Sequence, residues 1–157
     1  MGNTILNQWS RNNCWVFAMM AVLINKWVNI DIARLSELKA PYYPQLENLF
    51  IKEGLITKMI PINTTRLVDY WLKRWEWLIT STSRGDFSIN NNQWGMIEFD
   101  EKSQHFFVIC EDCWDKWKIV NSWGTQWGQE WYWYMKKSDF SKLFTPRRIV
   151  ANKNIWV

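Results

Sequence analysis

The longest uninterrupted apolar segment lies near the start of the chain, from Trp15 to Ile24, and polar residues precede it. Asn12 and Asn13 are good N-cap residues, and the segment is long enough for a helix, so we predict a helix over residues 14–28. This helix is apolar on nearly every face at first and should therefore be central and buried. Cys14 would lie in its first turn, where unpaired backbone N–H groups and the helix dipole favour a thiolate.

Periodicity and boundary residues predict three further helical segments in the first half of the chain. They are a helical turn over residues 33–39, a helix over residues 44–53 that ends at Gly54, and a helix that residues 63–65 cap and that continues to about residue 75. The last helix has an apolar stripe, formed by Leu67, Val68, Trp71 and Leu72. We interpret this stripe as core packing.

Short strand-like segments dominate after residue 75. We predict strands over residues 77–81 and 95–99, with a polar loop between them that contains Asn90, Asn91 and Asn92. A hairpin is predicted next, with arms over residues 105–110 and 117–120. Later predicted elements are a strand over 130–135, a short helix over 138–144 capped by Ser138, and a closing strand over 147–157. The expected fold is α+β, with helices on one side, a curled antiparallel sheet on the other, and the active site between them.

Composition fits one globular domain, because 157 residues with 48% apolar and 22% charged side chains can form a real core. The net charge of +4 comes from scattered lysines and arginines, so we expect no nucleic-acid binding. No segment is long enough to cross a membrane, and signal-peptide cleavage after the apolar run would discard Cys14. We expect most of the 14 tryptophans to form core and cleft walls, and so many also suggest aromatic surface that is available to a protein partner.

The three cysteines do not form a disulfide framework, which favours a cytoplasmic or otherwise reducing compartment. Cys110 and Cys113 form a C-x-x-C at the start of the hairpin turn. We favour two free thiols, with a labile disulfide as the main alternative. A structural zinc ion normally has four ligands and this chain has no second C-x-x-C, so we expect no metal and no other cofactor.

A thiolate nucleophile needs a base, and His105 is the sole histidine of the chain. Asn121 follows it in a segment rich in tryptophan and glycine. At these positions the chain resembles the papain-like cysteine peptidases. The resemblance lies in Gln8-x5-Cys14-Trp15-x-Phe17, in the interval from His105 to Asn121, and in Asn121-Ser-Trp-Gly-x-x-Trp-Gly128.

The resemblance implies a role for each matching residue. Cys14 would be the nucleophile, His105 the base that takes its proton, and Asn121 the residue that orients the imidazole. Gln8 would provide a side-chain donor to the oxyanion hole. Substrate-lining positions would be Trp15, Gln104, Trp123 and Trp127. The resemblance also implies a single papain-like domain over residues 1–157, with a helical half over about 1–76 and a β half over about 77–157.

The chain departs from secreted members of the family in several ways. Arg11 occupies the position where they usually carry a further, disulfide-bonded cysteine, and their substrate-lining Gly-Gly segment is absent. The chain is also compact, and nothing before its catalytic block would serve as a propeptide, which suits a bacterial or phage-type member. The resemblance covers residues 5–28 and 103–135, so the substrate specificity is not indicated.

Three classes of function are consistent with these residues. The first is hydrolysis of peptide bonds in a polypeptide substrate, which includes the case of one specific protein partner. The second is the same chemistry on another amide, as in a peptidoglycan amidase or endopeptidase, a deamidase or an acyltransferase. The third is a catalytically silent papain-like module that binds a protein through its tryptophan-rich surface. The matching set of Gln8, Cys14, His105 and Asn121 favours an enzyme.

Overall fold

The computed structural model describes residues 14–38, 43–82, 88–91, 97–100, 106–120 and 132–152. The helices are α1 (Cys14–Asn25), α2 (Ile32–Leu35), α3 (Tyr43–Lys52), α4 (Thr65–Leu72) and the 3-10 helix η2 (Lys137–Lys142). The strands are β1 (Ile56–Pro61), β2 (Leu78–Ser81), β3 (Ser88–Asn91), β4 (Ile97–Asp100), β5 (Phe106–Cys113), β6 (Lys116–Val120), β7 (Tyr132–Lys136) and β8 (Arg147–Ala151). The prediction of an α+β fold is confirmed.

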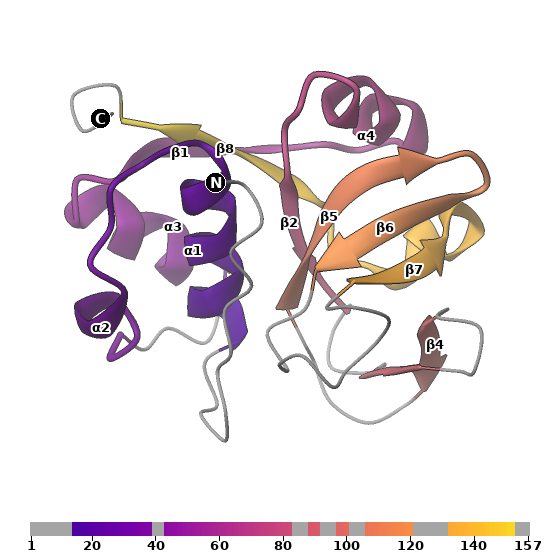
Figure 1. The fold of residues 1–157 in the computed structure, drawn as a ribbon, viewed down its shortest axis with the longest axis horizontal. Helices are drawn as coiled ribbons and strands as arrows, with labels where there is room; N and C mark the ends of the chain where they lie inside the picture. The colour runs from indigo at the N-terminus through magenta and orange to yellow at the C-terminus, as the bar shows by residue number, and fades with distance from the viewer. Residues whose placement is uncertain are drawn as a thin grey trace.

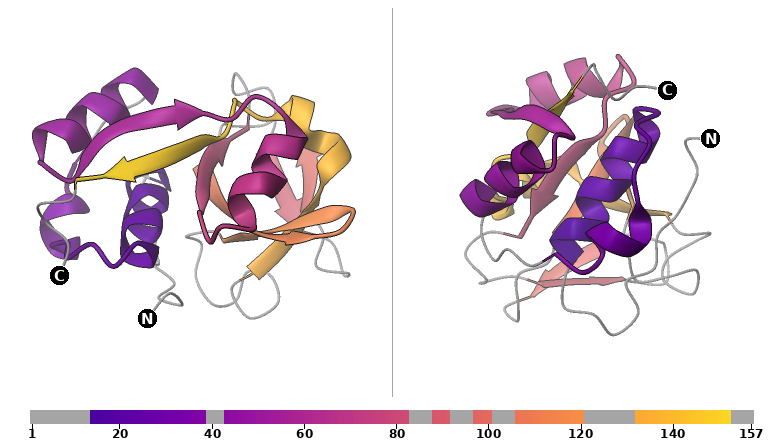
Figure 2. Two further views of the ribbon diagram at one scale, coloured as in Figure 1. Left: turned by 90° about the horizontal axis from the view of Figure 1, so that it is seen from above. Right: turned by 90° about the vertical axis from the view of Figure 1, so that its left-hand side faces the viewer.

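An antiparallel sheet with the strand order β1-β8-β2-β5-β6-β7 forms the body of the molecule, and β3 and β4 pair separately. β1 and β8 run from the group of α1, α2 and α3 to the strands on the other side of the molecule (Figures 1 and 2). β8 therefore lies between β1 and β2 rather than at the end of the sheet. One edge is partly blocked, because the Glu47 carboxylate of α3 accepts a hydrogen bond from the Met59 N–H of β1 at 2.6 Å.

Two hydrophobic clusters lie on opposite faces of β2, β5 and β6. Ile79 and Val108 belong to the first cluster, with α1 and α3, whereas their neighbours Leu78 and Ile109 belong to the second. Such alternation is expected because successive side chains of a strand point to opposite faces. The second cluster contains Val68 of α4, so α4 packs on the face opposite α1. The prediction that all helices lie on one side of the sheet is therefore wrong.

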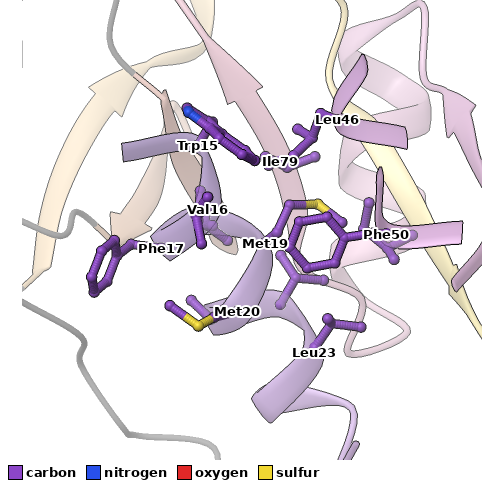
Figure 3. Packing of buried hydrophobic residues seen from close by; sticks show 14 of the residues in the cluster. Trp15, Val16, Phe17, Met19, Met20, Leu23, Leu46, Phe50 and Ile79 are labelled. Atoms are coloured by element: carbon purple, nitrogen blue, oxygen red, sulfur yellow. The ribbon is translucent and has the colours of Figure 1, made fainter. Parts of the chain in front are cut away.

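α1 is the buried centre of the first cluster, as predicted. Each residue from Trp15 to Leu23 is buried. Figure 3 shows side chains of α1 directed toward Leu46 and Phe50 of α3 and toward Ile79 of β2. Burial of a large apolar side chain stabilises a fold by about 1.5–3 kcal/mol, so this packing fixes the position of α1 and of the cysteine at its start.

Helices α1, α3 and α4 all end in the same Schellman geometry. After α1 the Val28 N–H bonds to the Leu23 carbonyl and the Trp27 N–H to the Ile24 carbonyl, and the other two helices repeat this pattern. The residue in the left-handed conformation is Gly54 after α3, as predicted, but Trp27 after α1 and Trp75 after α4. Helices α1 and α4 thus end about three residues before their predicted ends. For a residue other than glycine, the left-handed conformation normally costs about 1–2 kcal/mol.

Several other predicted boundaries differ from the structure. Asn90 and Asn91 are paired in β3 and are not part of a loop. The hairpin turn is shorter than predicted, because Cys113 pairs with Lys116. Ser138 does not cap η2, which begins one residue earlier and has no side-chain cap. Leu67 is 42% exposed and does not share in the core packing predicted for its stripe.

Candidate active site

Cys14 is the first residue of α1, and its sulfur is bonded to the start of β5. The thiol is half-buried, and Sγ accepts a hydrogen bond from the backbone N–H of Phe106 at 3.5 Å. Phe106 pairs with Ser81 of β2, and its side chain belongs to the core around α1. The first turn of α1 is therefore held against the end of the sheet at which β5 begins.

The end of β6 lies at the same end of the sheet. β5 and β6 are antiparallel, and Val108, two residues after the start of β5, pairs with Val120, the last residue of β6. Figure 1 shows the beginning of α1 at its lower end, facing the part of the sheet where β5 begins and β6 ends. The fold thus brings the start of α1 into contact with the start of β5, which is distant in the sequence, and the end of β6 lies beside that part of β5 in the sheet.

Two opposing effects act on the ionisation of Cys14. Burial raises the pKa of its thiol, while the backbone N–H groups of Phe106, Trp15 and Cys14 itself lower it. The backbone donors at the helix start therefore act in the direction that the sequence predicts. Burial is nevertheless the larger effect, and the pKa is raised. In this environment, the thiol needs a nearby base or cation to ionise at neutral pH.

Most of the predicted site residues lie outside the described residues. These are Gln8, Gln104, His105, Asn121, Trp123 and Trp127. Trp15 is described, and it is only 6% exposed, with its side chain directed toward Ile79 (Figure 3). Most of its surface is thus committed to the core rather than to a bound substrate. The sequence did not point to Phe106, whose backbone N–H contacts the sulfur.

The other two cysteines lie on β5, away from Cys14 along the strand. Both are half-buried. Cys110 packs against the first hydrophobic cluster and its Sγ donates a hydrogen bond to the Lys118 carbonyl at 3.4 Å, whereas Cys113 lies at the hairpin turn. Within the described part of the chain, no group of three or more His, Cys, Asp or Glu side chains is placed to hold a metal ion.

We expect the burial of Cys110 to make the fold less stable in alkali. Burial raises the pKa of this thiol; the Lys118 charge lowers it and the Glu111 charge raises it. The native state therefore keeps a proton that the unfolded chain releases above about pH 8.5, so unfolding free energy falls by about 1.4 kcal/mol per pH unit there. The free energies of unfolding of wild type and Cys110→Ala are measured in urea. Their difference should be constant from pH 5 to pH 7, and above pH 9 it should shift in favour of the variant. The same pH dependence of the free energy of unfolding in both proteins, from pH 5 to above pH 9, would contradict this effect.

No protein-family model matches this chain, and no curated protein sequence matches it. Among solved structures, the chain is similar to xylellain, a cysteine protease from Xylella fastidiosa, with 14% identity and a TM-score of 0.49. The similarity covers 74% of this chain and 46% of that one, so this chain spans less than half the length of that structure. None of the helices in the described residues has the length and apolar character needed to span a lipid bilayer.

Proposed function

We propose that this chain is a papain-like cysteine peptidase that hydrolyses peptide bonds with Cys14 as nucleophile and His105 as base. The observation that supports this most directly is the hydrogen bond from the Phe106 N–H to the Cys14 sulfur. Phe106 is the chain neighbour of the sole histidine. Two residue types that must meet for thiol catalysis thus come from segments that the fold holds in contact.

Covalent geometry restricts the position of both proposed partners of Cys14. Consecutive Cα atoms are about 3.8 Å apart, and His105 directly precedes Phe106 in the sequence. Asn121 is likewise one step from Val120, which is the last residue of β6 and pairs with Val108. The described neighbours of both proposed partners, Phe106 and Val120, lie at the Cys14 end of the sheet, and this supports the proposed Cys-His-Asn arrangement.

In the proposed reaction, His105 takes the proton from Cys14, and the thiolate attacks the carbonyl carbon of the scissile amide. The new C–S bond forms as the carbonyl π electrons move onto oxygen. When the carbonyl re-forms, the C–N bond breaks and His105 gives its proton to the departing amine. Water then adds to the thioester and gives a proton to His105, and cleavage of the C–S bond releases the acid and restores the thiolate.

The remaining residues of the proposed site act on charge and orientation. The Cys14 backbone N–H and the side-chain amide of Gln8 would donate hydrogen bonds to the developing oxyanion, and loss of one such donor typically costs about 10²–10³ in rate. Asn121 would accept a hydrogen bond from the second ring nitrogen of His105. The pKa of the Cys14 thiol is raised, so the thiol ionises at neutral pH only with a base beside it. In the proposed site, His105 is this base and removes the thiol proton.

Labelling with an epoxysuccinyl inhibitor tests this proposal. We expect mass spectrometry to find the label on Cys14 and not on Cys113, because only Cys14 would have a base to ionise it and a site to hold the inhibitor. Cys113 is the appropriate control, since it is also half-buried and burial also raises its pKa. The labelled protein should no longer cleave fluorescently labelled casein.

Other results would point to the alternative functions. Selective labelling of Cys14 in a protein that cleaves peptidoglycan fragments but not casein would keep the catalytic set and change the substrate class. Equal labelling of Cys14 and Cys113, with no cleavage of either substrate, would contradict an enzyme and favour a papain-like binding module.

A further inference from the structure

The ends of α1 and α4 meet on the surface and carry exposed aromatic side chains. The Asn25 side-chain amide at the end of α1 donates a hydrogen bond to the Trp75 carbonyl at 3.4 Å. Lys26 forms an ion pair with Glu76 directly beside this contact. The two left-handed tryptophans, Trp27 and Trp75, therefore belong to helix ends that are bonded to each other.

These tryptophans are far more exposed than is usual for such large side chains. Trp27 is 58% exposed and Trp75 is 88% exposed, and Tyr70 on the last turns of α4 is 43% exposed. The guanidinium of Arg74 lies 3.4 Å from the centre of the Tyr70 ring, which adds a cation to the aromatic surface. We call Trp27, Tyr70, Arg74 and Trp75 the α1–α4 patch.

Charges around the α1–α4 patch are mainly positive. Lys26 and Arg148 both pair with Glu76, so this one carboxylate faces two cations. Lys73 and Arg74 are exposed on the same helix end. Glu76 is thus the carboxylate beside these four cations, while the nearby carboxylate of α4, Asp69, is paired with Lys137.

We propose that the α1–α4 patch is a docking surface for an acidic polypeptide segment that carries an apolar anchor. Tryptophan, tyrosine and arginine are the residues that contribute most to protein interfaces, and the surplus of cations selects an acidic partner. A second copy of this chain does not fit, because a symmetric contact would bring like charges together.

This surface is separate from the proposed catalytic residues. Cys14 is the first residue of the 12-residue helix α1, and Trp27 follows its last turn. At 1.5 Å per residue, the two ends are about 18 Å apart. Docking at the α1–α4 patch is therefore independent of Cys14, and it is best measured in a Cys14→Ala protein.

The test measures fluorescence anisotropy of labelled synthetic peptides with Cys14→Ala protein. The probe is a short peptide of glutamates interrupted by leucines, and the comparison peptides replace either the glutamates by lysines or the leucines by serines. Trp27→Gly and Trp75→Gly should each weaken binding of the acidic probe at least tenfold while the thermal midpoint stays the same or rises, because glycine suits both backbone positions. Arg74→Gln should also weaken binding and reduce its dependence on salt.

Trp114→Gly is the matched control. Trp114 also has a positive φ and is 93% exposed, but it lies on the hairpin turn between β5 and β6. This variant should bind the acidic probe as the parent protein does. The proposal would be overturned by an equal loss of affinity for the acidic probe in all three glycine variants. It would also be overturned if the lysine peptide bound as well as the acidic probe, or if the acidic probe did not bind. Capture by vesicles of phosphatidylserine with no peptide binding would assign the patch to a membrane surface and would also overturn it.

Discussion

Replacing His105 by alanine should slow the reaction of Cys14 with iodoacetamide at pH 6 by about 10²–10³-fold, because an isolated thiol with a pKa near 8.5 is almost entirely protonated there. In this protein, burial raises the pKa of Cys14 further, so the loss should reach at least that range. The rate is measured by quantifying alkylated Cys14 over time by mass spectrometry. Alkylation of Cys113 in the same samples is the internal control and should not change.

The pH dependence of the same reaction separates a base from a merely structural histidine. In the wild type, we expect Cys14 to react well into the acid range, because the thiolate is stabilised by the imidazolium. Casein cleavage should be bell-shaped with pH, rising as the pair forms and falling as His105 deprotonates. In His105→Ala, alkylation should follow a single rising curve with its midpoint above the ordinary cysteine value. A variant that is slower but has the wild-type pH profile would contradict the role of His105 as base.

How far the sequence predicts the structure depends on whether the relevant contacts are local. The buried helix α1 and the Thr64 cap of α4 were predicted because they depend on nearby residues, and Thr64 Oγ1 does accept the Leu67 N–H. β1 was missed because it is an edge strand whose partner β8 is nearly one hundred residues away and whose register is interrupted between Ile56 and Lys58. Its buried positions do not alternate regularly, so no period of two is visible.

The preferences of single residue types for strands and helix ends also led to wrong predictions of element boundaries. Asparagines are poor strand formers, yet Asn90 pairs with Glu98 and Asn91 with Ile97 of β4, so this weak preference does not decide the local structure. Trp27 and Trp75 adopt a conformation for which glycine is the usual signal, so nothing in the sequence marked these helix ends. For the site, the sequence identified residue types and their order, while the contact between Cys14 and the Phe106 N–H depends on the packing of α1 against β5.

Asp69 links α4 to the second core, and Asp69→Ala should lower the free energy of unfolding by about 2–4 kcal/mol. Its carboxylate accepts a hydrogen bond from the indole N–H of the fully buried Trp117 at 2.8 Å and one from Lys137 Nζ at 3.1 Å. A buried donor left without its acceptor costs about 1–3 kcal/mol, and loss of a hydrogen bond to a charged group adds to this. Urea unfolding monitored by circular dichroism measures the change.

The contact with Lys137 allows the contribution of the Asp69 charge to be separated from that of its hydrogen bond to Trp117. Burial by itself would lower the pKa of Lys137, but its hydrogen bonds to Asp112 and Asp69 outweigh burial, and the pKa is raised. The lysine therefore remains charged at neutral pH, between two carboxylates. Asp69→Asn keeps an acceptor for Trp117 while removing one of these charges, so it should cost clearly less than Asp69→Ala. An equal loss of unfolding free energy in both variants would show that the Asp69 charge, and not its hydrogen bond to the buried indole, makes the larger contribution.

The same two variants separate stability from catalysis. Asp69, Asp112 and Lys137 hold the turn end of the β5–β6 hairpin, whereas the Cys14 contact is at its opposite, open end. Folded Asp69→Ala should therefore alkylate Cys14 at the wild-type rate at temperatures well below its unfolding midpoint. A lower rate in the folded variant would mean that strain at the turn end reaches the sulfur along β5, and the hairpin would then have to be treated as part of the catalytic apparatus.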